Sequence, residues 1–229
     1  MEWIAFAFAA ALGGLGTGEG RFSGDDLPSK IPLAPADIVV VKSCCIPMSF
    51  PGYMHFAHHS WIDVKRGSED RWFRVEVAEV ERGGVAYPIA ASYARSDIRW
   101  ENRPVRVLGI LSGKGAEKAV DHVVRTAIAR GPAYKTIYKP LPGPNSNTFI
   151  RELTRGISRL SFYFHHNAVG KDYASTLVLL RAPSGTGWTI TCPYGGLTIA
   201  VREGVQLHFL GFTLGSYGLP PKIEVPFLP

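Results

Sequence analysis

The stretch "GPNSNTF", residues 143–149, places four small polar side chains directly before an apolar run. The apolar residues of that run recur at helical spacing: Phe149, Ile150, Leu153 and Ile157. This spacing predicts a helix that begins within 145–148, where one polar side chain is enough for a cap. The first turn of a helix has unpaired N–H groups and favours negative charge. Ser146 is therefore a candidate nucleophile, with an ordinary N-cap as the alternative.

Histidines that could act as a base gather at two places, His55, His58 and His59, and later His165 and His166. Because side chains alternate along a strand, His59 shares a face with Trp61 and Asp63, whereas His58 shares the other face with Ser60 and Ile62. Edge or loop histidines without chemistry are the plain alternative. A metal site that combines a histidine of the first group with one of the second is the other alternative, but no Cys or His spacing matches a known metal motif. We therefore expect neither a metal ion nor another cofactor.

The segments "HSWI" (59–62) and "NSNTF" (145–149) resemble the permuted papain-like clan of lecithin:retinol acyltransferase and the NlpC-type peptidases. In that clan a strand histidine precedes a helix start of the form "N-C-x-x-F". The resemblance places His59 on the base, Ser146 on the nucleophilic cysteine and Phe149 on the anchoring aromatic. With "AVGKDY" and "SGTGW", the chain also resembles an uncharacterised bacterial family of secreted or membrane-anchored proteins, over about residues 35–220.

A serine in the nucleophile position changes the chemistry. A hydroxyl is too weak an acid to ionise at a helix start, so His59 would have to remove the proton of Ser146 during attack. If residues 65 and 72 face each other around a hairpin turn, Glu76 is the diagonal neighbour of His59 and can orient its ring, with Asp63 as the second choice. Free N–H groups just after Ser146 would form an oxyanion hole.

The resemblance implies a hydrolase or acyltransferase acting on an amide or ester bond of a peptide, cell-wall or lipid-like substrate. A non-catalytic module that binds such ligands in the same cleft is the alternative, because fold does not fix function. We expect the substrate to contact polar residues near the helix start: Asn145, Asn147, Tyr138, Lys171 and Asp172. Lys171 and Asp172 could instead form a surface ion pair, which contributes little.

The elements that position these residues follow from the periodicity. Strands are expected at 37–43, at 58–66 and 71–80 as a β-hairpin, at 103–111, and repeatedly after residue 175. The segment "GAEKAVDHVVRTAIAR" (115–130) has its apolar residues at helical spacing. Strands, two helices and strands again predict an α+β fold with an antiparallel sheet and packed helices, and the resemblance makes it permuted papain-like. Residues 31–229 are expected to form one domain.

Composition limits the function classes. A chain of 229 residues, 46% hydrophobic and 19% charged, can bury a full core. The net charge is +6, but Lys and Arg form no continuous stripe, so we expect no nucleic-acid partner. An anionic lipid or cell-wall surface suits the charge equally well. Three cysteines cannot all pair; they are interpreted as small core residues, with a bridge from Cys44 or Cys45 to Cys192 left open.

The N-terminus carries the apolar stretch "WIAFAFAAALGGLG", residues 3–16, which has the length of a signal-peptide core. It lacks a positively charged start, since Glu2 is acidic. Residues 1–30 are therefore interpreted as an export signal or membrane-anchor remnant followed by a linker, with a buried helix as the alternative. This interpretation predicts an exported or membrane-anchored protein of the cell envelope.

Overall fold

The computed structural model contains two antiparallel sheets and two helices. It describes residues 36–48, 50, 52–67, 69, 71–80, 85–93, 103–157, 159–217 and 222–227. The first sheet has the strand order β4-β3-β2-β1-β5. Its strands are β1 (Ile38–Cys45), β2 (His58–Lys65), β3 (Trp72–Val80), β4 (Val85–Tyr93) and β5 (Arg106–Ser112), with the short 3-10 helix η2 (Gly52–Met54) between the first two.

The second sheet follows in sequence and has the order β11-β10-β9-β8-β7-β6. Its strands are β6 (Val178–Arg181), β7 (Gly187–Thr191), β8 (Gly195–Ala200), β9 (Gly204–Phe209), β10 (Phe212–Tyr217) and β11 (Lys222–Glu224). Each consecutive pair is antiparallel, as short connections favour. The expected α+β class with antiparallel strands is confirmed, but the strands form two sheets.

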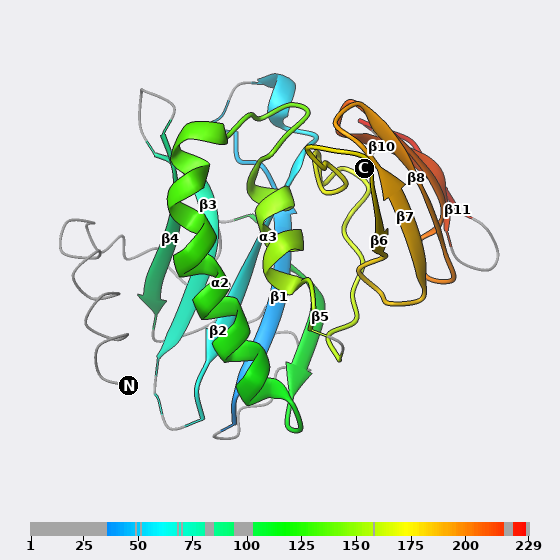
Figure 1. Cartoon of the computed structure of the whole chain (residues 1–229). Coiled ribbons are helices and arrows are strands. Elements are labelled where there is room, and N and C mark those ends of the chain that lie inside the picture. Colours follow the sequence, from blue (N-terminus) through cyan, green and yellow to red (C-terminus); the bar gives the residue numbers. More distant parts are fainter. Residues whose placement is uncertain are drawn as a thin grey trace.

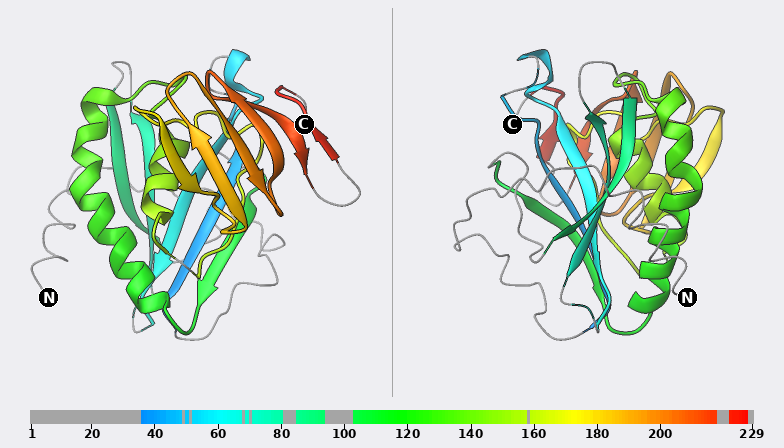
Figure 2. Two further views of the ribbon diagram at one scale, coloured as in Figure 1. Left: turned by 45° about the vertical axis from the view of Figure 1, so that its right-hand side comes forward. Right: turned by 90° about the vertical axis from the view of Figure 1, so that its left-hand side faces the viewer.

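Helices α2 (Ala116–Ile137) and α3 (Ser146–Thr154) lie against one face of the first sheet (Figure 1). Two turned views show the second sheet on that same side, next to α3 (Figure 2). Helix α2 continues past Pro132, seven residues beyond the end expected at Arg130. Its last turns contribute Tyr134, whose ring meets that of Phe149 edge-on at 4.9 Å, so packing against α3 compensates for the proline.

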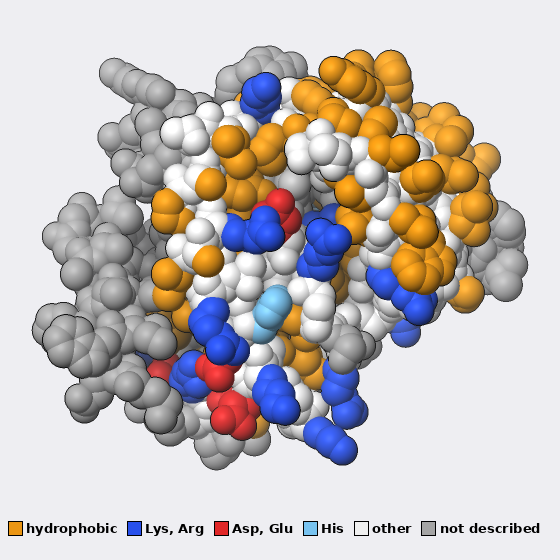
Figure 3. Space-filling view, in the orientation of Figure 1, with side chains coloured by type: hydrophobic (Ala, Val, Ile, Leu, Met, Phe, Trp, Pro, Cys, Tyr) orange, Lys and Arg blue, Asp and Glu red, His pale blue; other side chains and the backbone are white. Residues whose placement is uncertain are grey.

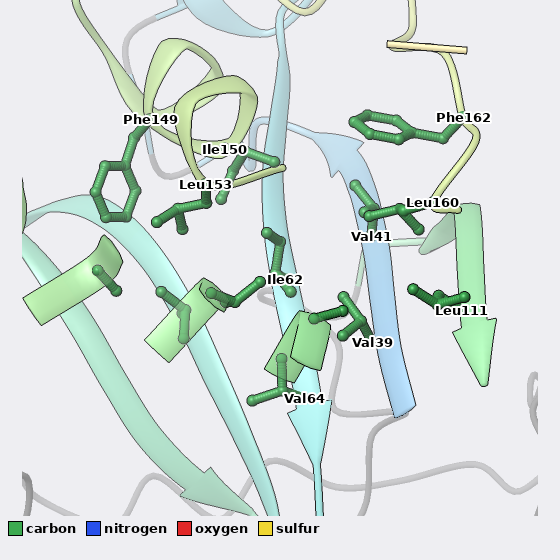
Figure 4. Packing of buried hydrophobic residues seen from close by; sticks show 14 of the residues in the cluster. Val39, Val41, Ile62, Val64, Leu111, Phe149, Ile150, Leu153, Leu160 and Phe162 are labelled. Carbon is green, nitrogen blue, oxygen red and sulfur yellow. The ribbon is translucent and has the colours of Figure 1, made fainter. Parts of the chain in front are cut away.

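The core lies between the first sheet and the helices. Alternate residues of β1, β2 and β3 face it, namely Val39, Val41, Ile62, Val64, Val75 and Val77. They pack against the apolar face of α3, formed by Phe149, Ile150 and Leu153, all of which are fully buried (Figure 4). The face expected for α3 is confirmed. Burial of this face, rather than helix propensity, holds a nine-residue helix in place.

The opposite face of the first sheet carries buried charges. Asp63 on β2 accepts hydrogen bonds from Lys42 Nζ at 2.8 Å and Arg74 Nε at 3.0 Å. Burial alone would raise the pKa of Asp63, but Arg74 and Lys42 lower it. A buried charge is tolerated only when it is paired in this way. This face is therefore distinct from the helical face in both composition and partners.

The second sheet has a polar inner face and an apolar outer face. The buried inner residues include Thr189, Thr191, Thr198, Gln206, His208 and Thr213. Thr198 Oγ1 lies 2.7 Å from His208 Nε2, and Thr213 Oγ1 lies 3.1 Å from His208 Nδ1, so these inner hydroxyls pair with the His208 ring. The alternate residues, such as Ile190 and Leu207, are exposed.

The expected export or anchor segment, residues 1–30, lies outside the described residues. Within the part of the chain that is described, no helix is both long and apolar enough to cross a membrane. The proposed boundary at residue 31 also falls outside that part.

Candidate functional site

The start of α3 is fixed by Asn145, which is the N-cap residue. Its Oδ1 accepts hydrogen bonds from the N–H groups of Asn147 at 3.0 Å and Thr148 at 3.2 Å. Thr148 Oγ1 accepts from the Asn145 N–H at 3.2 Å, which completes a capping box. The Asn145 side chain also donates to Val169 O, and the absence of a Cβ at Gly170 leaves room for it. Asn145 is thus fully used by the fold.

Asn147 and Thr148 connect α3 to its surroundings. Asn147 Nδ2 donates to His58 O and to Val169 O, both at 2.9 Å. Thr148 Oγ1 donates to Gly170 O at 2.7 Å. These bonds join the helix start to the first residue of β2 and to the turn that follows residue 168. The amides expected to contact substrate, Asn145 and Asn147, are instead engaged within the protein.

Ser146 is the first helical residue and not the cap. Its side chain is 8% exposed, and its hydroxyl forms no hydrogen bond with any residue that the structure describes. Of the four polar residues at 145–148, Ser146 alone has no structural bond from its side chain within the described chain. The N-cap alternative for Ser146 is therefore ruled out by the position of Asn145.

The histidine on the helical face of β2 is His58. It shares this face with Ile62 and Val64, and its carbonyl oxygen is bonded to Asn147 of α3. On β1, Cys45 Sγ lies 3.2 Å from His58 Nε2, and Ser43 Oγ lies 3.2 Å from His58 Nδ1. A nucleophilic group, an imidazole and a hydroxyl therefore form one hydrogen-bonded chain beside the start of α3.

A second histidine stacks on the first. The rings of His58 and His165 lie 3.7 Å apart at an interplanar angle of 6°. Burial, reinforced by nearby positive charge, lowers the pKa of His58 to about 4 and that of His165 to about 3. The lowered pKa keeps both rings neutral at pH 7 and makes His58 a weaker base than an ordinary imidazole.

His59 and Glu76 meet as expected, but on the other face of the sheet. His59 Nε2 lies 2.7 Å from Glu76 Oε2. Strands β2 and β3 pair Ile62 with Val75, which is the register that the hairpin with residue 65 opposite residue 72 predicts. Both side chains are on the face that also carries Asp63, away from α3. The structure thus brings His59 to Glu76 but not to Ser146, because the period of two sends adjacent residues to opposite faces.

The helix N–H groups expected for an oxyanion hole are largely occupied. The amides of Asn147 and Thr148 donate to Asn145 Oδ1, and the Phe149 amide donates to Asn145 O. Within the described chain, the Ser146 N–H is the first-turn amide without an acceptor. A single backbone donor therefore remains, together with the positive end of the helix dipole.

Lys171 and Asp172 are buried, not a surface pair. Asp172 accepts from Arg151 of α3 at 2.5 Å, lies 2.8 Å from His208 Nδ1 of β9, and also contacts Lys171 Nζ. Burial opposes ionisation of Asp172, but His208, Lys171 and Arg151 hold its pKa well below the ordinary value. This cluster joins α3 to the inner face of the second sheet, which is a structural role.

Tyr138 and the cysteines complete the expected residues. Tyr138 ends α2, where its N–H donates to Tyr134 O at 3.2 Å, and it packs against the core. The cysteines Cys44, Cys45 and Cys192 are all unbridged. Burial raises the pKa of Cys44 to about 12, as for an inert core thiol. Cys45 is only partly buried and contacts the His58 ring. Its interpretation as a core residue is therefore wrong.

Sequence patterns could have found His58. The faces of 58–64 follow from alternation, and the apolar pair Ile62 and Val64 marks the face that meets the helices. Cys45 and Arg151 carry no sequence signal, since their partners come from other elements. Among the described residues, no cluster of three His, Cys, Asp or Glu side chains is arranged for a metal ion.

Comparison with known proteins places this arrangement in a family. A family model described as "Protein of unknown function (DUF3750)" matches residues 39–173. The chain belongs to this family. The match supports the expected uncharacterised domain family, and it includes His58, Ser146 and Asp172 but ends before β6. No curated protein and no solved structure matches the chain, so the resemblance to the papain-like clan has no support beyond the motifs.

Proposed function

We propose that the protein is a hydrolase or acyltransferase that acts on an amide or ester bond, with Ser146 as nucleophile and His58 as base. One observation carries the proposal. Asn145, Asn147 and Thr148 are committed to the fold, whereas Ser146 sits at the helix start with a hydroxyl that bonds no described residue. In this proposal the fold is a permuted papain-like one, in which His58 takes the position first given to His59.

The reaction requires a proton transfer within this site. Ser146 Oγ attacks the carbonyl carbon of the substrate while its proton passes to a ring nitrogen of His58. The Ser146 N–H and the dipole of α3 stabilise the oxyanion that forms. The protonated His58 then gives its proton to the leaving nitrogen or oxygen, and water or a second acceptor repeats the sequence to release the acyl group.

His58 must leave its present contacts to serve Ser146. Its two nitrogens lie against Ser43 and Cys45, so one of these bonds has to yield when substrate binds. The contact with Ser43 can remain and orient the ring, as a third group does in many nucleophile–histidine pairs. Cys45 is then the partner that is displaced, which makes its thiol the competing nucleophile.

A serine-directed fluorophosphonate probe tests the proposal on the full chain, with the labelled residue identified by mass spectrometry. We expect the label on Ser146, none in Ser146→Ala, and labelling at least about a hundredfold slower in His58→Gln, the usual scale of a general base. Ser112→Ala, an exposed serine, is the matched control. His59→Gln should label at the wild-type rate when compared at equal folded fraction.

Two results would contradict this assignment. Labelling of Ser146 that depends on His59 and not on His58 would make His59, the base expected from the sequence, the base of the reaction. Rapid alkylation of Cys45 by iodoacetamide, lost in His58→Gln and accompanied by no fluorophosphonate labelling, would make Cys45 the nucleophile. The replacement Cys45→Ser separates these cases, because it should abolish the thiol reaction and leave a Ser146 reaction in place.

A binding module for peptide, cell-wall or lipid-like ligands is the second candidate. Asn147 Oδ1 is buried, and no described residue donates a hydrogen bond to it. An unpaired buried acceptor costs free energy, which a ligand N–H group could recover. The absence of any label on Ser146 or Cys45, combined with saturable ligand binding that Asn147→Ala weakens by removing the Oδ1 acceptor, would favour this candidate. Export to the cell envelope remains a proposal that goes with either function.

A further inference from the structure

The outer face of the second sheet is apolar across its whole width. Strand registers align Leu179, Ile190, Leu197, Leu207 and Leu214 in one row across five strands. A neighbouring row contains Trp188, Ile199, Val205 and Ile223. Except for Leu197, which is partly buried, all of these residues are between 44% and 78% exposed. Figure 3 shows hydrophobic side chains gathered where Figure 1 places this sheet.

This arrangement reverses the usual orientation of a sheet. An antiparallel sheet normally buries its apolar face and exposes its polar one. Here Thr189, Gln206 and His208 point inwards and are paired within the protein, whereas the leucines point outwards. Contiguous exposed apolar surface of this kind marks an interaction site in a soluble chain.

The charges around this face identify the partner. Between residues 174 and 227 the only acids are Glu203 and Glu224, and both are buried. The only Lys and Arg residues of this segment are Arg181, Arg202 and Lys222, and all three are exposed. The surface of the second sheet therefore carries positive charge without exposed negative charge. Arg181 lies 4.3 Å from the ring of Trp188, which places a cation next to the apolar rows.

We infer that the outer face of β6–β11 docks on an anionic lipid bilayer. Apolar side chains would enter the boundary between headgroups and acyl chains, while Arg181, beside Trp188 on the outer face, would contact the negative headgroups. Arg202, which donates to Ser161 Oγ at 3.0 Å, and Lys222, which alternates with the outward Ile223, lie at the borders of the sheet and would add longer-range attraction. The apolar stretch at residues 3–16 is an independent sequence feature that also points to a membrane. A second copy of this chain fits less well, because each face would bring Arg181 to the interface and this segment exposes no carboxylate to pair with it.

Cosedimentation of the full chain with lipid vesicles tests the inference. We expect strong binding to vesicles that contain phosphatidylglycerol, weaker binding to phosphatidylcholine alone, and loss of the difference at high salt. The triple variant Ile199→Thr, Val205→Thr, Leu207→Thr keeps strand-forming residues at exposed positions and should bind at least about tenfold more weakly. The matched control is Ile128→Gln with Ile137→Gln, two exposed apolar residues of α2, which should leave binding unchanged.

Two further variants separate the contributions. Replacing Arg181, Arg202 and Lys222 with Gln should remove the preference for phosphatidylglycerol. Binding that survives the triple variant but is lost in Phe6→Ser with Phe8→Ser would assign the membrane contact to the N-terminal stretch and overturn the inference. A wild-type dimer in solution that the triple variant converts to a monomer, without vesicle binding by either, would overturn it in favour of self-association.

Discussion

His58 and His59 are adjacent in the chain but face opposite sides of β2. His58 Nε2 lies 3.2 Å from Cys45 Sγ on the side of the helices, and His59 Nε2 lies 2.7 Å from Glu76 Oε2 on the side of the buried charges. The first histidine is therefore next to a helix start with a serine hydroxyl, and the second is held by a carboxylate. In the proposed reaction His58 is therefore the base, whereas His59 is paired with Glu76 on the opposite face of the sheet.

The His58 ring should make stability depend on pH. Its pKa is about 4 in the folded chain against 6.5 in the ordinary state, so the unfolded chain binds the proton first as pH falls. The free energy of unfolding should be highest above pH 6.5 and decrease towards pH 4. Between pH 7 and pH 5 the loss due to His58 is about 2 kcal/mol.

Urea unfolding at pH 7 and pH 5 measures this dependence. In His58→Gln the decrease between the two pH values should be smaller than in the wild type, and His165→Gln should act in the same direction because the pKa of His165 is also lowered. An equal decrease in wild type and His58→Gln would show that the ring is not held neutral by burial.

The cap of α3 should be sensitive to Asn145 and insensitive to Ser146. Asn145→Ala removes the acceptor for two amides and should cost at least about 1 kcal/mol of unfolding free energy. Ser146→Ala should stay within about 0.5 kcal/mol, since its hydroxyl bonds no described residue. Asn145→Asp keeps the acceptor oxygen, so its cost measures the two bonds that Asn145 Nδ2 donates to Pro140 O and Val169 O. Equal costs for Asn145→Ala and Ser146→Ala would reassign the cap.

Phe149 should be among the most costly residues to truncate. Its side chain is fully buried between α3, Tyr134 and the sheet, so Phe149→Ala should cost about 3–5 kcal/mol. Ile137→Ala, on an exposed position of α2, serves as the control and should cost far less. A near-neutral Phe149→Ala in chemical denaturation would mean that α3 does not depend on this face.

The charge cluster of Asp63 should also be strongly coupled to folding. Asp63→Asn leaves Lys42 and Arg74 buried without their carboxylate and should cost about 3–5 kcal/mol. The comparison is Asp121→Asn, whose partner Arg66 forms an exposed pair worth less than about 1 kcal/mol. Similar costs for the two replacements would indicate that water reaches Asp63.

Local sequence patterns predicted the helices and strands better than they predicted the contacts between them. Alternation along 58–64 and the hairpin turn gave the register of Ile62 with Val75, because both depend on neighbouring residues. The strand β4 was not among the expected strands; it lies at the edge of the sheet, a position that tolerates Pro88. Helix α2 extends to Ile137, beyond the segment 115–130 whose apolar spacing predicted it.

Which face of β2 meets the helices is decided by packing between distant elements. The alternation alone fits a sheet covered on either side, and the one sequence signal for the covered side is the apolar pair Ile62 and Val64 on the face of His58. The contact of Cys45 with His58 and that of Arg151 with Asp172 join segments that are unrelated in sequence. These contacts require the coordinates.

The order in which Asp172 acquires its partners has a consequence for synthesis of the chain. Arg151 and Lys171 precede or adjoin Asp172, but Gln206, which bonds Lys171, comes 35 residues later, and His208 follows it. While a ribosome adds that stretch, Asp172 can meet Thr191 of β7 but lacks His208, and Lys171 lacks Gln206. The contact between Arg151 of α3 and Asp172 is therefore completed by its remaining buried partners only after β9 has been synthesised.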